Sequence, residues 1–186
     1  MIYEKIDGWF NYELFYNEML DRFDNATFVE IGVWKGASIA FLAERIKDLK
    51  KNIKLYAIDG FDGYGEDSYF SDPDCKNNRL YETYLNNIKP LKKYITTIVG
   101  YSHDVYNQFS DESIDFLFLD GDHRYDGVMN DLILWYPKVK RGGVIGGHDY
   151  GQTHGECRVK DAVDDYFYDT PVTVYDKSYA LWYYNK

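Results

Sequence analysis

The chain has 186 residues, of which 45% are hydrophobic and 19% aromatic, so we expect a single folded domain over 1–186 rather than a disordered chain. Its formal net charge of −10 would repel phosphate backbones, which excludes nucleic acid and anionic membranes as expected partners. No apolar run approaches the ~20 residues of a membrane span, and the N-terminus lacks the pattern of a secretory signal, so we expect a cytoplasmic location.

Apolar strands and amphipathic helices alternate along the chain. After an N-terminal helical cap over 1–25, with its helix around 10–23, strands are expected at 26–34, 53–58, 94–100, 113–120 and 142–150. The expected helices run from Gly36 to 51, from 77 until Pro90 stops the helix, and over 102–109, 125–136 and 158–169. A stretch rich in Gly and Asp, 60–75, shows no periodicity and is expected to be a loop.

The end of the chain breaks this alternation. Residues 170–186 contain two strands around the short turn "DKS", and strands joined without a helix must pair antiparallel. The sequence therefore predicts an α/β fold, a Rossmann-like three-layer α/β/α sandwich, whose mostly parallel seven-stranded sheet ends in an antiparallel β-hairpin. In such sheets, ligands bind at the carboxyl ends of the strands.

The first turn from strand to helix, "EIGVWKG", carries Gly32 and Gly36, with Glu30 before them. A dinucleotide turn needs a further glycine so that the backbone can approach a pyrophosphate, but Val33 and Trp34 stand in that place. Glu30 adds negative charge where an anion would lie. We therefore favour a ligand without phosphates, preferably a cationic one. The alternative is a glycine turn that only links the strand to the helix.

Two later strand ends carry groups that suit an adenosine ligand. Asp59 ends the second strand, where an acid commonly accepts hydrogen bonds from ribose hydroxyls, although it could instead be a helix-capping or turn aspartate. Ser102 and His103 follow the third strand and could reach an adenine edge, but Ser102 could equally be a helix N-cap. Together with the glycine turn, Asp59 favours a ribose.

Acids and histidines gather at the ends of the fourth and fifth strands. Asp120 ends "SIDFLFLD", and His148 and Asp149 stand near the end of "GGVIGGHDY". Because neighbouring parallel strands lie ~4.8 Å apart, these three side chains are expected to meet around one ion beside the ligand. Asp122 could point into the same cleft as a base, and His123 is a second candidate.

The alternative for this group is a set of solvated acids that cap the following helix. It suits Asp126, near the start of the helix over 125–136, better than it suits Asp120 or Asp149. We therefore expect Asp126 to be a cap.

A family resemblance rests on four segments: "VEIGVWKGAS", "LYAIDGF", "FLFLDGDHRYDGVMNDLILWYPKVKRGGVIGGHDY" and "RVKDAVDDYF". Together they resemble the class I S-adenosylmethionine-dependent methyltransferases, and within them the family-24 group. The likeness covers about 27–168 in family order, and the terminal hairpin agrees with that fold. It implies S-adenosylmethionine as cofactor, with its methionine part at Glu30, Gly32 and Gly36, its ribose at Asp59, and its adenine at Ser102 and His103. The resemblance adds Ser38, Gly60 and Asp120 to the same cofactor site.

More distantly, "IVGYSHD" and "FLFLDGDHRY" look like strands of the catechol O-methyltransferases, and "HDYGQTHGECRVKDAVDDYF" looks like the macrolide-sugar and aminocoumarin O-methyltransferases. This resemblance implies a magnesium ion at Asp120 and the strand-five pair that gathers the two oxygens of a diol, with Asp122 matching the proposed base of the sugar enzymes. The chain departs at His148, where those families carry a carboxylate. Magnesium prefers oxygen ligands, so a histidine there either shifts the preference toward manganese or iron or leaves the ion shell.

We therefore expect an S-adenosylmethionine-dependent methyltransferase that acts on an oxygen of a small hydroxylated acceptor. A divalent metal, magnesium or manganese, at Asp120, His148 and Asp149 is left open. The proton would pass to Asp122, His123 or His148.

The loop 60–75 and the N-terminal helix, with Trp9, Phe10 and Phe15, could close over the acceptor, or a second subunit of a homo-oligomer could complete the pocket. A non-catalytic protein that binds the nucleotide cofactor is the first alternative function. An NAD(P) oxidoreductase is the second, and the first turn disfavours it.

Overall fold

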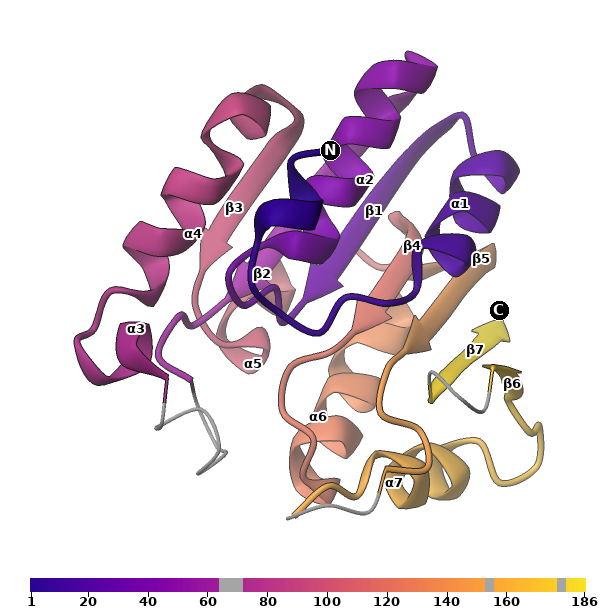
Figure 1. Ribbon diagram of the computed structural model, residues 1–186. Helices are drawn as coiled ribbons and strands as arrows, with labels where there is room; N and C mark the ends of the chain where they lie inside the picture. Colours follow the sequence, from indigo (N-terminus) through magenta and orange to yellow (C-terminus); the bar gives the residue numbers. More distant parts are fainter. Residues whose placement is uncertain (64–71, 153–155, 177–179) are drawn as a thin grey trace.

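One sheet of seven strands forms the centre of the fold (Figure 1). The computed structural model describes residues 1–63, 72–152, 156–176 and 180–186. Within the sheet the strands follow the order β3-β2-β1-β4-β5-β7-β6. Their bounds are β1 Asn25–Ile31, β2 Asn52–Asp59, β3 Ile95–Val99, β4 Ile114–Leu119, β5 Val139–Gly147, β6 Thr173–Asp176 and β7 Leu181–Asn185.

The strands pair in parallel except at one edge. β1 pairs with β2 and β4, β2 with β3, and β4 with β5, all in parallel, whereas β7 lies antiparallel between β5 and β6. Two glycines of β5 allow the close approach of β7: a Cβ at Gly146 would lie 2.7 Å from the Trp182 carbonyl oxygen, and one at Gly147 would lie 2.8 Å from Trp182 Nε1. The predicted parallel sheet with its terminal antiparallel hairpin is confirmed.

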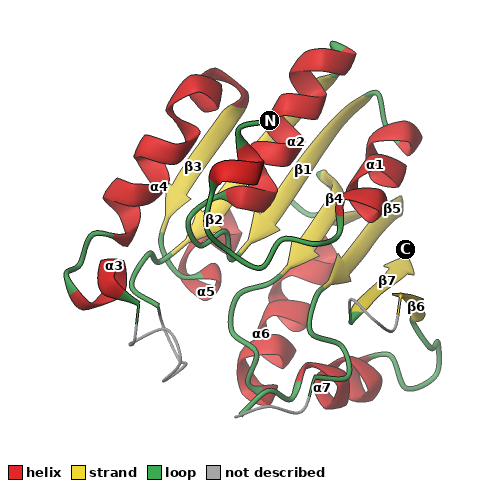
Figure 2. Ribbon diagram, in the orientation of Figure 1, coloured by secondary structure: helices red, strands yellow, loops and turns green. Residues whose placement is uncertain are grey.

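Helices cover both faces of the sheet and give three layers (Figure 2). Helices α1, α2 and α4 pack on one face, and α5, α6 and α7 on the other. The bounds are α1 Glu13–Arg22, α2 Ala37–Leu49, α3 Pro73–Lys76, α4 Leu80–Ile88, α5 Ser102–Val105, α6 Tyr125–Trp135 and α7 Val159–Tyr166, with 3-10 turns η1 Tyr3–Lys5, η3 Lys89–Tyr94, η4 Tyr106–Gln108 and η5 Tyr136–Lys138. Among the described helices, none has the length and apolar character needed to cross a bilayer.

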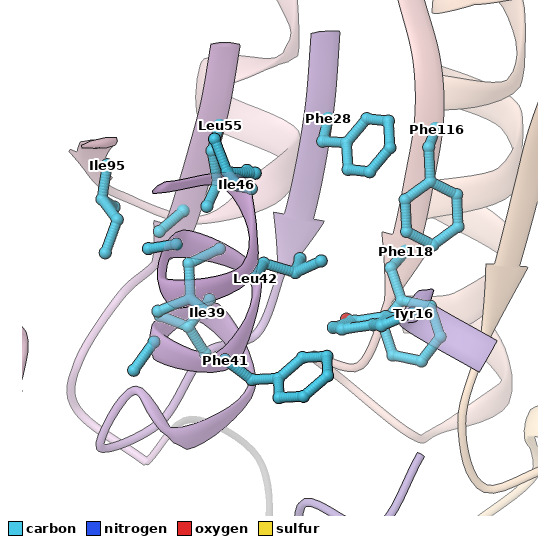
Figure 3. Close-up of a cluster of buried hydrophobic side chains, with 14 of the residues drawn as sticks. Tyr16, Phe28, Ile39, Phe41, Leu42, Ile46, Leu55, Ile95, Phe116 and Phe118 are labelled. Atoms are coloured by element: carbon cyan, nitrogen blue, oxygen red, sulfur yellow. The ribbon is translucent and has the colours of Figure 1, made fainter. Parts of the chain in front are cut away.

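The central strands are buried on both faces, because successive side chains point to opposite sides of a strand. In β1, Phe28 packs with α1, α2 and α4, whereas the next residue, Val29, packs with the helices of the opposite layer. Figure 3 shows the first of these clusters, in which Leu42 and Ile46 of α2 lie with Phe28 and Leu55 of the sheet. Both faces of the sheet are therefore filled, which leaves the carboxyl ends of the strands for a ligand.

Some element boundaries differ from the prediction. β5 begins at Val139 rather than at 142, because an irregularity in the β4–β5 pairing lets Val139 pair with Ile114 before Val144 pairs with Phe116. In the predicted loop 60–75, residues 64–71 lie outside the described part, and Pro73–Lys76 form α3. The last predicted helix ends at Tyr166, short of 169.

Candidate functional site

A cavity of about 680 Å³ lies at the carboxyl ends of the parallel strands. Its walls come from the segments that follow β1, β2, β3, β4 and β5 and from residues 7–12, which precede α1. The predicted site residues in its lining are Gly32, Ser38, Asp59, Gly60, Ser102, His103, Asp120, Asp122, His123, His148 and Asp149. Glu30 and Gly36 are not in this lining. The fold therefore brings the ends of five strands to one cavity.

The turn after β1 packs closely against the end of β4, the strand that pairs with β1 in the sheet. Gly32 has a φ of +83°, and a Cβ there would lie 2.0 Å from the Asp120 carbonyl oxygen and 2.7 Å from the Gly121 Cα. Gly36, at the N-cap of α2, has a φ of +93°, and its Cβ would lie 2.9 Å from the Tyr84 ring. Both positions require glycine, Gly32 because backbone fills the space of a side chain.

Asp59 holds the backbone of that turn. Its Oδ2 accepts hydrogen bonds from the N–H groups of Val33 and Trp34 at 2.8 and 2.9 Å, and its Oδ1 accepts the N–H of Phe61 at 2.7 Å. Burial raises the pKa of Asp59, although these three N–H groups oppose the rise. The turn role that was the alternative for Asp59 is therefore present, and both of its oxygens are already engaged.

A second acid after β2 lies in the cavity wall and was missed by the sequence analysis. Asp62 lines the cavity and accepts a hydrogen bond from the hydroxyl of Tyr101, which follows β3. The signal was present in "DGFDG", where Asp62 follows Asp59 by three residues. The edge of the cavity between β2 and β3 thus carries two carboxylates.

Glu30 is buried beneath the turn rather than exposed in the cavity. Its side chain is 1% exposed, and the hydroxyl of Ser38, which does line the cavity, donates a hydrogen bond to it. Burial raises the pKa of Glu30 to about 8. In the protein without ligand the carboxyl is therefore mostly protonated at neutral pH, so the negative charge expected at this turn is suppressed.

This shift gives a testable pH dependence. Because the pKa of Glu30 is about 8 in the fold and 4.5 ordinarily, the unfolded chain ionises first as the pH rises from 5 to 8. We expect the free energy of unfolding of the wild type to decrease over this range. In Glu30→Gln this decrease should be smaller by about 2–4 kcal/mol, as measured by urea unfolding at each pH. Glu82→Gln, on an exposed site of α4, is the control and should leave the slope unchanged. An equal slope in Glu30→Gln and the wild type would contradict the burial argument.

Ser102 is fixed by a buried acid. It is the first residue of α5 and makes no capping bond, so its alternative role as a helix N-cap is wrong. Its hydroxyl instead donates to Oδ1 of Asp131 in α6, which is 4% exposed and lines the cavity. Beside it, the His103 ring stacks on Tyr101 with centroids 5.6 Å apart. Asp131 was missed because its place on the apolar face of the helix gave no partner for it.

Two carboxylates and two histidines meet at the ends of β4 and β5. His123 Nε2 lies 3.5 Å from Asp120 Oδ1 and 3.2 Å from Asp149 Oδ2, and one ligand atom from each of these three residues falls within 4.8 Å of the others. His148 Nδ1 lies 3.0 Å from Asp149 Oδ2 and 4.0 Å from Asp120 Oδ1. The meeting of Asp120 and Asp149 was predicted, but His123 takes the central place that was expected for His148.

His148 has one ring nitrogen that the protein leaves unsatisfied. Its Nε2 is shielded from solvent and has no hydrogen-bond partner among the described residues. Burial lowers the pKa of His148, but the hydrogen bond to Asp149 and the charge of Asp120 outweigh burial and raise this pKa above its usual value. A buried polar atom without a partner costs free energy, so this position is suited to a ligand group or an ion that would satisfy it.

Tyr12 connects the N-terminal part of the chain to this cluster. Its hydroxyl donates to Oδ2 of Asp120 at 3.1 Å, and its ring, 4% exposed, lies against Phe118 and His148 with centroids 5.0 and 5.2 Å away. The bond fixes the orientation of the Asp120 carboxylate and leaves Oδ1 on the side of the histidines. No local pattern indicates a contact between residues that stand 108 positions apart.

Asp122 is held in an ion pair. Its oxygens accept from the Arg124 side chain at 2.6, 3.0 and 3.3 Å and from the Arg124 N–H at 2.9 Å. Burial would raise the pKa of Asp122, but these bonds outweigh it and lower the pKa. Arg124 is the N-cap residue of α6 and Asp126 lies in the first helical turn, so the expectation that Asp126 caps this helix is wrong.

Comparison with known proteins identifies the family. Residues 29–150 match the methyltransferase domain of family 24. The chain belongs to this family. An uncharacterized protein of Acanthamoeba polyphaga mimivirus is 30% identical to this methyltransferase domain over 143 residues, which are 76% of this chain and 59% of that protein. The chain thus spans less than two thirds of that relative.

Two solved O-methyltransferases share the fold of this methyltransferase domain. NovP has a TM-score of 0.70 and 20% identity, with coverage of 94% of this chain and 77% of NovP. The TDP-rhamnose 3'-O-methyltransferase of calicheamicin biosynthesis has a TM-score of 0.64 and 13% identity, with coverage of 93% and 78%. These similarities establish the Rossmann-like methyltransferase fold.

The N-terminal segment of this methyltransferase domain forms one wall of the cavity. Trp9 and Phe10 line it, as predicted, whereas Phe15 is 0% exposed and packs in the core beneath the sheet, so its expected place over the acceptor is wrong. Lys35, in the turn after β1, is buried and binds Asp7 at 3.0 Å and Asp72 at 2.8 Å. The segment is therefore fastened at Asp7 and, through Tyr12, at Asp120.

Proposed function

We propose that this domain transfers a methyl group from S-adenosylmethionine to an oxygen of a small hydroxylated acceptor. The observation that carries the proposal is the single cavity that joins the glycine turn after β1 to the cluster of Asp120, His123, His148 and Asp149. The described lining contains eight aspartates and one arginine, a balance that favours a sulfonium cofactor and disfavours nucleic acid or another anionic acceptor.

The cofactor fits along the ends of β1, β2 and β3. The narrow turn at Gly32, with Ser38 above buried Glu30, suits the methionine part. Asp59 and Asp62 border the place of the ribose, and because the oxygens of Asp59 hold the turn, Asp62 is the additional acid for a ribose hydroxyl. Ser102 and His103 remain the proposed adenine side.

A divalent cation fits Asp120, His123 and Asp149. Two carboxylates and one imidazole are a donor set for manganese or iron rather than for magnesium, which prefers oxygen alone. When bound there, the cation would act as a Lewis acid toward the acceptor hydroxyl. His123, first a candidate base, thus replaces His148 as the nitrogen ligand, and of the two roles first considered for His148 only that of the base is kept.

His148 suits proton removal better than Asp122 does. Asp149 orients His148 through Nδ1, which leaves Nε2 to accept the hydroxyl proton as the bond from the acceptor oxygen to the methyl carbon forms and the carbon–sulfur bond breaks. Asp122 is a weaker base because its ion pair with Arg124 stabilises the ionised form.

Binding and turnover test this function separately. Calorimetry should show that the chain binds S-adenosylhomocysteine, and label from methyl-labelled S-adenosylmethionine should appear in members of a panel of neutral diols, sugars and phenols. Turnover should be lost with chelator and restored by manganese. Tight binding without methyl transfer to any acceptor would favour the non-catalytic alternative, and tighter binding of NADH would favour an oxidoreductase. Turnover that resists chelator would remove the metal from the proposal.

Tyr12→Phe isolates the orientation of Asp120. Loss of the hydroxyl removes one hydrogen bond from a carboxylate ligand, and such outer partners change metal affinity by about 10- to 100-fold. We expect Tyr12→Phe to weaken manganese binding within that range, measured by the electron paramagnetic resonance signal of the free ion, while the affinity for S-adenosylhomocysteine stays near wild type. Tyr16→Phe, which removes another buried hydroxyl of the same region, is the control. Unchanged manganese affinity in Tyr12→Phe would remove Tyr12 from the site.

A further inference from the structure

Asp131 is a buried acid that the proposed methyl transfer does not use. It belongs to α6, whose other buried residues are Val128, Leu132 and Trp135, so a carboxyl interrupts an otherwise apolar face. The residue is only 4% exposed, yet it lines the cavity. Burial of a carboxyl without enough hydrogen bonds costs free energy, which makes a purely structural acid at this position an expensive choice.

The protein supplies few donors to this carboxyl. The hydroxyl of Ser102 donates to Oδ1, and within the described part of the chain no other group donates to Asp131. A carboxylate can accept about four hydrogen bonds, so most of its capacity is unused. Burial raises the pKa of Asp131 to about 7, with the charge of Asp122 adding to the rise, as expected for an acid that lacks partners.

Two stacked aromatic rings and a closely packed glycine lie near Asp131. The stacked rings of Tyr101 and His103, with an interplanar angle of 5°, stand beside Ser102 at the end of β3. One helical turn before Asp131, a Cβ at Gly127 would lie 2.3 Å from the Asp122 carboxyl carbon, so a side chain there would displace that carboxylate. All five of these residues line the cavity, which gives it a planar aromatic side next to a hydrogen-bond acceptor.

We propose that Asp131 accepts a hydrogen bond from the 6-amino group of the cofactor's adenine, held in place by Ser102, and so selects a 6-aminopurine over a 6-oxopurine. The inference rests on the proposed function, because the adenine side was assigned there to Ser102 and His103. Ionised Asp131 adds the acceptor that an exocyclic amine requires, whereas the oxygen of a 6-oxopurine would face an ionised carboxylate oxygen without a donor between them.

The test compares S-adenosylhomocysteine with its 6-oxo analogue, S-inosylhomocysteine, by calorimetry at pH 8, where most of Asp131 is ionised. The wild type should bind the amino compound about 10- to 100-fold more tightly, the size expected for one hydrogen bond to a charged group. Asp131→Asn should narrow this ratio to within about threefold, because its amide can donate to the 6-oxygen. Ser102→Ala should reduce the ratio less, since the carboxyl stays and only its orientation is released.

Asp48→Asn is the control, because it removes an aspartate from an exposed position of α2 outside the cavity lining and should keep the wild-type ratio. A merely structural Asp131 would give a variant that binds both compounds more weakly with the ratio unchanged, and that result would overturn the inference. If Asp131→Asn does not fold, an unchanged ratio in Ser102→Ala has the same meaning. If the wild type binds the amino and the 6-oxo compound equally well, the inference about Asp131 fails but the proposed function stands. If the wild type binds neither compound, the proposed function fails as well.

Discussion

Gly32→Ala is expected to cost about 2–5 kcal/mol of unfolding free energy. The new Cβ would lie 2.0 Å from the Asp120 carbonyl oxygen and 2.4 Å from its carbon, both of them backbone atoms that cannot rotate away. Overpacking of a rigid site costs about 1–3 kcal/mol, and the φ of +83° adds about 1–2 kcal/mol for any residue with a Cβ. Urea unfolding followed by circular dichroism measures the loss, and a chain that fails to fold counts as the same result.

Gly142→Ala separates the two causes. Gly142 has a φ of +81°, close to that of Gly32, but a Cβ there would meet nothing within 4 Å. This variant should therefore lose only about 1–2 kcal/mol, the cost of the backbone conformation. Equal losses in the two variants would show that the approach of β1 to β4 does not require glycine. A folded Gly32→Ala should also bind S-adenosylhomocysteine poorly, because the displaced turn forms the cavity wall.

His148→Gln is expected to lower turnover by about 100- to 10,000-fold, the usual contribution of a positioned base. Glutamine keeps a polar side chain of similar length but has no nitrogen that accepts a proton at neutral pH. Because His148 is placed outside the ion ligands but bonds Asp149 through Nδ1, manganese affinity should fall by no more than about 10- to 100-fold, whereas S-adenosylhomocysteine affinity should stay near wild type. Single-turnover methyl transfer, with both affinities measured in parallel, gives the comparison.

Asp122→Asn is the counterpart of this variant. If the ion pair with Arg124 is the main role of Asp122, turnover should stay within about tenfold of wild type. A large loss in Asp122→Asn together with an active His148→Gln would reverse the assignment and restore the base implied by the sugar methyltransferases. A loss of manganese affinity well beyond about 100-fold in His148→Gln would instead make His148 an ion ligand, as the sequence first indicated.

The fold was predictable because its signals are local and repeated. Buried parallel strands read as continuous apolar runs, and the missing helix before β7 required an antiparallel edge. The start of β5 was not predictable, since "KRGG" reads as a loop while the pairing of Val139 with Ile114 depends on a distant strand. Helix ends were uncertain by a few residues for the same reason.

The site residues that directly follow an apolar strand could be predicted from the sequence. Asp120, His148 and Asp149 each follow an apolar run, and the strand order brought Asp120 and Asp149 together. Two contributions were missed. Tyr12 reaches Asp120 from outside the sheet and had no local signal, whereas the spacing of Asp131 from Val128 and Leu132 placed it on the apolar face of its helix but gave no partner for it. Their roles depend on three-dimensional neighbours, which one sequence does not display.

The walls of the cavity come mainly from two parts of the chain: the residues that match the family, and the segment before α1 that is held by Asp7 and Tyr12. The residues that match the family, 29–150, supply the glycine turn and the cluster of acids and histidines, whereas Trp9, Phe10 and Tyr12 lie before that match. Two members that match the family equally well can therefore carry different walls on this side of the cavity. Acceptor preference would then diverge through a few N-terminal residues, while the part of the domain shared by the family stays the same.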